Sequence, residues 1–197
     1  MTAAQNPFEA LFTSPAYLAR QAERERICAD RRTAFLAEHG DERAAFRDTP
    51  MEDALRDACE PLMDLAEVAR GLCRLAGWDA HDAFDDMPPA LCAAVTEAWP
   101  IPTTVADAWT EFQATEARTA DRQAFSEGYE PPVFVEARQR VLEEMLNDFP
   151  AWCLDDLRAR LSWLERLNEL GAPRIEVQRE RLGVLRADVE RMIGDDP

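Results

Sequence analysis

The chain has 197 residues and a formal net charge of −17, from 39 acidic residues against 22 basic residues that are all arginine. Hydrophobic residues make up 47% of the chain, which supplies a core for one compact domain or two small ones and excludes a disordered tail. Direct binding to nucleic acid is disfavoured, because phosphates are bound by a basic footprint. No apolar run is long enough to span a membrane and residues 1–13 do not resemble a signal peptide, so we expect a soluble cytoplasmic protein.

The pattern of apolar residues is helical from end to end, and prolines and glycines stand where helices should begin and end. In chain order, we expect helices over residues 14–39, 50–76, 88–99, 104–127, 131–149, 150–170 and 173–193. The first helix has a thin apolar stripe, which is typical of an exposed arm or of a helix that packs on a partner. The predicted fold is all-α, an irregular bundle of six or seven helices that ends in an antiparallel helical hairpin.

The excess negative charge lies in the middle of the chain. Residues 1–49 contain 8 acidic residues and 7 arginines, residues 50–157 contain 23 and 7, and residues 158–197 contain 8 and 8. A uniformly acidic composition would acidify the whole chain, so this asymmetry favours a basic partner for the middle. We divide the chain into an N-terminal arm and first helix (1–49), an acidic helical core (50–150) and a C-terminal helical hairpin (151–197), the last two expected to form one domain.

The second expected helix carries the most regular polar pattern of the chain. Thr49 and Glu52 predict a capping box at its start, and Pro61 predicts a kink or a meeting point of two helices. Its acidic residues recur at spacings of four and three, which places them on one face along about 21 Å of a continuous helix. These candidate partner-binding residues are Asp53, Asp57, Glu60, Asp64 and Glu67.

Two interpretations of this acidic row stay open. A row of carboxylates on an outer helix face commonly serves only to keep a protein soluble. Alternatively, negative charges about one helical turn apart stand in for a nucleic-acid backbone and pair with the arginines and lysines of a basic cleft.

The stretch GWDAHDAFDDMPP at residues 77–89 contains the metal candidates, His81 and Asp82. Its composition favours a capped polar connection between two helices, and its acids do not follow the spacing of a calcium loop. Together with His39 upstream and Asp148 or Asp155 downstream, the pair resembles the H…HD…D pattern of HD-domain metal phosphohydrolases. That resemblance implies a metal-dependent phosphohydrolase on an all-helical fold; the residues by themselves lead us to expect no metal and no cofactor.

Other common enzyme signatures are missing from the sequence. The absence of lysine excludes Schiff-base chemistry and the lysine of a phosphate-binding P-loop, and none of the three serines lies in a G-x-S-x-G motif. The five cysteines are widely spaced without a C-x-x-C pair, which predicts buried free thiols. A carboxylate-only catalytic site would be invisible among 39 acids. We expect a protein that is not an enzyme.

The hypothesis that follows is a protein-binding module, an acidic inhibitor or decoy that occupies the basic nucleic-acid-binding surface of a protein or nucleoprotein complex. The arginine-only, alanine-rich composition suggests a GC-rich bacterial genome, or a phage or mobile element within one. Small acidic anti-defence proteins of such elements, including anti-CRISPR proteins, are similar in type. The alternatives are an adaptor bundle that uses the hairpin at 151–193 to dimerise or dock, with a homodimer left open, and the HD-like enzyme.

Overall fold

The computed structural model describes residues 12–64, 74–80, 86–171 and 175–194, and the chain divides into two compact units. The first unit contains residues 1–47 and 117–130, and the second contains residues 48–116 and 131–197. The first unit is therefore built from two separate stretches of sequence. A single helix supplies residues to both, because residues 105–116 belong to the second unit and residues 117–125 to the first.

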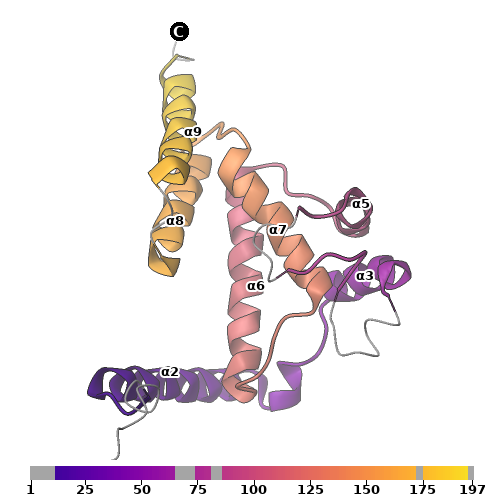
Figure 1. Ribbon diagram of the computed structural model, residues 1–197, viewed down its shortest axis with the longest axis vertical. Helices are drawn as coiled ribbons and strands as arrows, with labels where there is room; N and C mark the ends of the chain where they lie inside the picture. The colour runs from indigo at the N-terminus through magenta and orange to yellow at the C-terminus, as the bar shows by residue number, and fades with distance from the viewer. Residues whose placement is uncertain (1–11, 65–73, 81–85, 172–174, 195–197) are drawn as a thin grey trace, which may run out of the picture. The chain divides into compact units, whose positions relative to one another are not determined.

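The all-α prediction is confirmed, since the described residues form helices and no strand (Figure 1). The seven α-helices described are α2 (Pro15–His39), α3 (Pro50–Cys59), α5 (Pro89–Ala98), α6 (Val105–Phe125), α7 (Val133–Asp148), α8 (Leu154–Leu170) and α9 (Ile175–Gly194). Two short 3-10 turns, η1 (Glu42–Ala44) and η2 (Glu60–Leu62), connect parts of them. The C-terminal hairpin is present as α8 and α9, which lie side by side. None of the described helices combines the length and the apolar character needed to cross a membrane.

Helix ends follow the expected local signals closely. The side chain of Ser14 accepts a hydrogen bond from Tyr17 N at the start of α2, and Gly40, with φ of 72°, ends that helix in the left-handed conformation that glycine favours. Thr104 accepts from Asp107 N at the start of α6. Because each signal acts within one turn of the chain, these ends are set locally.

In the first unit, the end of α2 packs against the last turns of α6. The Phe35 ring is buried and meets the Phe125 ring edge-on, with 5.6 Å between ring centroids. Arg31 Nε donates to Asp121 Oδ1 at 2.6 Å. No other described side chain of α2 is buried, which agrees with the thin apolar stripe seen in its sequence.

The second unit has two hydrophobic clusters, and α7 contributes to both. One cluster joins α7 to α3 and α5 through Ala137 and Val141, and the other joins it to α6 and α8 through Leu142 and Leu146. All of these α7 side chains are buried because adjacent positions face different neighbours around the helix. The centre of the second cluster is Trp163 of α8, which is 2% exposed.

The continuous helix expected over 50–76 is not formed. The helix α3 ends at Cys59, η2 follows, and Met63 is extended and forms an antiparallel bridge with Leu75. The physical reason is Pro61, which has no N–H to donate and whose ring clashes with the carbonyl four residues earlier. The alternative of two helices meeting at Pro61 falls on residues 65–73, which lie outside the described residues.

Gly77 lies in a tight turn, not directly after a helix as the sequence suggested. Leu75 and Trp78 exchange backbone hydrogen bonds of 3.3 and 2.9 Å across Ala76 and Gly77. Both central residues have positive φ, 51° and 81°, as a two-residue turn of this kind requires. Glycine adopts this conformation freely, whereas Ala76 is strained there because its Cβ approaches the following carbonyl.

The capping box of α3 gives a direct test of this local control. Thr49 Oγ1 accepts from Glu52 N at 3.1 Å, and Glu52 Oε2 accepts from Thr49 N at 2.7 Å. We expect Thr49→Ala to lower the free energy of unfolding by about 0.5–2 kcal/mol, measured by urea denaturation. Thr33→Ala, which removes a hydroxyl on the exposed face of α2, is the control and should change it by less than about 0.5 kcal/mol. Equal effects of the two substitutions would contradict this account.

Candidate functional site: an acidic helix face and a buried charge network

Three of the predicted carboxylates share the exposed face of α3 and η2. Asp53, Asp57 and Glu60 are exposed, and spacings of four and three residues keep them on one side along about 10 Å of the helix. The other side carries Leu55 and Cys59, which are 0% and 1% exposed. Hydrophobic burial of one side therefore turns the three carboxylates outward.

Arg56 offsets part of this charge. It donates to Asp53 Oδ1 at 2.9 Å and also to Asp48, and all three side chains are well exposed to solvent. Exposed ion pairs of this kind contribute about 0–1 kcal/mol and rearrange easily. Asp57 and Glu60 form no hydrogen bond or ion pair through their carboxylates with the described part of the chain.

The other two predicted residues are not placed on this helix face. Asp64 is exposed but follows Met63, whose extended backbone ends the helical periodicity. Glu67 lies outside the described residues. The row expected over about 21 Å is therefore corrected to three carboxylates on one helix face, and the cause is again the helix end that Pro61 imposes. A role for all five residues in binding a partner stays a prediction.

The surplus of negative charge belongs to the second unit. The first unit contains 10 acidic residues and 9 arginines, whereas the second contains 29 and 13. Some of these acids pair internally, such as Glu116, which accepts from Arg166 at 2.7 Å. Even if every arginine of the second unit held one carboxylate, 16 carboxylates would have no arginine of that unit to neutralise them.

The metal candidates are not assembled by the described residues. His81 and Asp82 lie outside them, and His39, in the first unit, is exposed with its ring 4.2 Å from the Phe35 ring centroid. Asp148 and Asp155 are exposed in the second unit. Where the chain is described, no group of three or more His, Cys, Asp or Glu side chains is placed to hold a metal ion. The HD-like pattern stays untested.

The cysteines are less uniformly buried than the sequence suggested. Cys59 is buried, which raises the pKa of its thiol, and Cys28 and Cys92 are half-buried. Cys153 is exposed, contrary to the expectation, because it precedes the first turn of α8. These four are free thiols; Cys73 lies outside the described residues.

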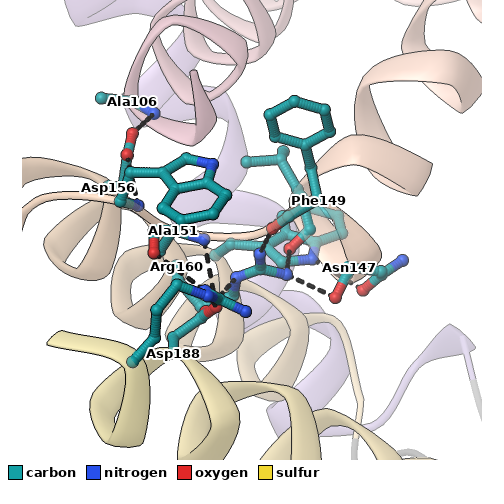
Figure 2. A network of polar contacts seen from close by, with 11 residues as sticks. Ala106, Asn147, Phe149, Ala151, Asp156, Arg160 and Asp188 are labelled. Atoms are coloured by element: carbon teal, nitrogen blue, oxygen red, sulfur yellow. Dashed lines mark hydrogen bonds and ion pairs between the residues drawn. The ribbon is translucent and has the colours of Figure 1, made fainter. Parts of the chain in front are cut away.

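A buried charge network joins the four helices α6, α7, α8 and α9 in the second unit (Figure 2). Asp156 of α8 is 1% exposed, and its carboxylate accepts from Ala106 N at the start of α6 and from Trp152 N, each at 3.0 Å. Burial by itself would raise the pKa of Asp156, but these hydrogen bonds and those from Cys153 outweigh it and lower the pKa. Asp156 thus caps a helix that is 50 residues away in the sequence.

Arg160, one turn further along α8, binds the C-terminal end of α7. Its guanidinium donates to three backbone carbonyls around the C-terminal end of that helix, those of Leu146, Asn147 and Phe149. The Arg160 side chain is 1% exposed, and its Nε lies 3.6 Å from Asp188 Oδ2 of α9 (Figure 2). Burial lowers the pKa of Arg160, and the nearby carboxylates counteract that shift.

Asp188 completes the network from α9. It is 1% exposed, and its Oδ1 accepts from Ala151 N at 3.0 Å and from Arg191 at 2.9 Å. Arg191 also donates to Ala151 O and stacks over the Trp152 ring, 4.9 Å from its centroid. Two carboxylates and two guanidinium groups therefore balance each other inside the fold.

A second buried arginine acts in the same way at another junction. Arg138 of α7 is 0% exposed and binds Glu111 of α6 through two hydrogen bonds of 2.7 and 3.1 Å. It also donates to the carbonyls of Trp99 and Pro100, directly after α5. These carbonyls have no partner in their own helix, so Arg138 satisfies them.

The contacts of these networks join helices to distant backbone groups, which is a structural role. Arginine does not lose its proton in proteins, and a carboxylate with a lowered pKa is a weak base. These networks were not predictable from charge counts, because a count does not separate arginines that are buried from arginines that only balance acids at the surface. A signal was present: Asp156 and Arg160 flank Ala159 on the same helix face as Trp163, where a solvent-exposed charge is not expected.

Comparisons of this chain with protein-family models, with curated proteins and with solved structures found no match.

The Asp156 carboxylate predicts a pH-dependent contribution to stability. We expect Asp156→Asn to lower the free energy of unfolding by about 2–3 kcal/mol at pH 7, because an amide cannot replace a carboxylate that accepts several hydrogen bonds. The pKa of Asp156 is lower in the folded protein than its ordinary value of 3.8. Its stabilisation is therefore fully present above that value and is lost as the pH falls below it.

Urea denaturation of the wild type and of Asp156→Asn between pH 7 and pH 3 measures this difference. The neighbouring Asp155→Asn is the matched control, because the Asp155 side chain is 75% exposed, and it should change stability by less than about 0.5 kcal/mol. A difference between wild type and Asp156→Asn that stays constant down to pH 3 would exclude the proposed role of the charge.

Proposed function

We propose that this protein is a non-enzymatic, acidic binding module whose second unit engages a basic surface of another protein or nucleoprotein complex. The observation that carries the proposal is the separation of charge between the two units. The first unit is almost neutral, while the second has 16 more acidic residues than arginines. A uniform solubility requirement gives no reason for this difference, whereas a basic partner does.

The helix α3 is the centre of the proposed surface. The exposed Asp53 and Asp57 of α3 and Glu60, the first residue of η2, lie about one helical turn apart, and the buried side of α3 holds them outward. Like charges at this spacing cost about 0.2–0.5 kcal/mol per pair in an isolated helix. Arginine or lysine side chains of a partner would relieve this repulsion through charge-assisted hydrogen bonds.

The chemistry of such a surface indicates the class of partner that it would bind. A row of exposed carboxylates fits clefts that are lined with arginine and lysine, and nucleic-acid-binding proteins have such clefts. Occupation of that cleft would exclude nucleic acid, which is the action of an inhibitor or decoy. An anti-defence protein of a phage or mobile element is our specific version of this proposal.

The test is capture of partners from a GC-rich bacterial lysate at low and high salt, with DNA and RNA as competitors. We expect a retained partner that is released by either nucleic acid and whose affinity falls tenfold or more as the salt concentration rises through the physiological range. The triple variant Asp53→Asn, Asp57→Asn, Glu60→Gln should lose this partner. A variant with the same loss of charge at scattered exposed positions, Asp86→Asn, Glu97→Gln, Glu144→Gln, should keep it.

A partner that resists both salt and nucleic acid would refute the decoy. Equal loss of binding in both triple variants would show that total charge matters and that the α3 face does not.

The adaptor function is the second candidate, and one observation favours it. Large apolar side chains of the hairpin are exposed, among them Leu154 at 65%, Leu182 at 59% and Ile193 at 71%. Binding through such faces depends little on salt, which separates this candidate from the decoy in the same experiment.

A further inference from the structure

The outward side of α8 carries a stripe of four leucines. Leu154, Leu157, Leu161 and Leu164 follow each other at spacings of three, four and three residues, which places them along one side of the helix. Leu154 is 65% exposed and Leu161 is 44% exposed, while the other two are half-buried. The inward side of α8 is occupied by the buried residues Asp156, Ala159, Arg160 and Trp163.

One flank of this stripe carries two opposite charges. Arg158 and Glu165 are both exposed and lie seven residues apart, that is, two turns apart on the same flank. Arg158 pairs with Asp155 at 2.7 Å, but both side chains are 75% exposed, so the pair contributes little. Glu165 forms no ion pair with any described residue. Both charges are therefore available to another molecule.

We propose that two copies of this chain associate through α8, with the two helices antiparallel and Leu161 near the twofold axis. Such an axis, perpendicular to the helices, brings a given flank of α8 against the same flank of the other copy. Residues whose distances from Leu161 along the chain differ by no more than one residue then lie within about 1.5 Å of the same level. Leu157 meets Leu164 of the other copy, and Arg158 meets Glu165 of the other copy on the outer flank, each contact occurring twice.

The charge pattern selects this arrangement over a parallel one. In a parallel pair, the flank with Arg158 and Glu165 would face the opposite flank of the other helix, which carries Arg160 and Leu167 and is turned inward. Only the antiparallel pair places both charges opposite their complement. Interhelical ion pairs beside an apolar seam are known determinants of helix orientation.

The charge of the whole chain also points to the hairpin as the place where copies can meet. Residues 151–197 contain 10 acidic residues and 8 arginines, whereas the rest of the second unit contains 19 acidic residues and 5 arginines. Two strongly acidic surfaces would repel each other, whereas two nearly neutral ones repel each other little. A contact centred on one helix of 17 residues has the size of a weak, concentration-dependent interface.

Sedimentation velocity of the full chain at low and high protein concentration tests the proposal. We expect reversible dimers in the wild type and an association at least about tenfold weaker in Arg158→Glu and in Glu165→Arg, since each single variant places like charges opposite each other twice. An equal mixture of these two variants should associate again, because each contact between the two variants then joins opposite charges. Glu97→Arg, the same charge change at an exposed position of α5, should associate like the wild type.

Leu161→Asp tests the apolar part of the interface separately. Because Leu161 is exposed in the single chain, the variant should keep the helical circular dichroism of the wild type and lose self-association. A wild type that stays monomeric at high concentration overturns the proposal, and so does a dimer that survives Leu161→Asp. A mixture of the two charge variants that associates no better than either alone overturns the antiparallel arrangement. These measurements require no acidic-surface partner, so the decoy proposal and this one fail independently.

Discussion

Buried arginines hold the second unit together. Arg160 donates to the carbonyls at the end of α7 and faces Asp188 of α9, and Arg138 joins α6 to the residues that follow α5. Helix ends leave backbone carbonyls without a partner, and a buried carbonyl without a hydrogen bond is costly. A guanidinium group has five donors in one plane, so a single side chain satisfies several carbonyls and a carboxylate together, which a lysine could not do.

This use of arginine shapes the surface as well as the interior. Arginines that are committed to helix ends and to buried carboxylates are not free to neutralise the outside of the unit. The remaining carboxylates, such as Asp57 and Glu60, are left exposed and unpaired with any described residue. The interior is electrically balanced while the surface is acidic. The nearly neutral hairpin offers a different kind of surface, which is apolar and carries paired charges. The two proposals concern these two surfaces.

Much of the fold could be predicted from the sequence because its signals are local. The helix starts at Ser14 and Thr49 and the helix end at Gly40 appear where caps and glycine place them, and each depends on residues within one turn. The acidic face of α3 was likewise predictable as far as Glu60. Pro61 marked the place of the error. The sequence predicted a kink or two helices meeting there, whereas α3 ends before Pro61 and the chain is extended at Met63.

The sequence by itself determined the all-α class, most helix boundaries and the asymmetry of charge, because composition and helical periodicity act over short distances. Only the tertiary structure decided which charges lie inside. Asp156 is buried because the N-terminus of α6 meets α8 there, and its partner Ala106 is 50 residues away in the sequence. Arg160 is buried because the C-terminus of α7 meets α8 there, and its partner Leu146 is 14 residues away. A charged side chain on a helix is buried when backbone groups from distant segments form hydrogen bonds with it. The residues next to it in the sequence do not indicate that these groups will be there.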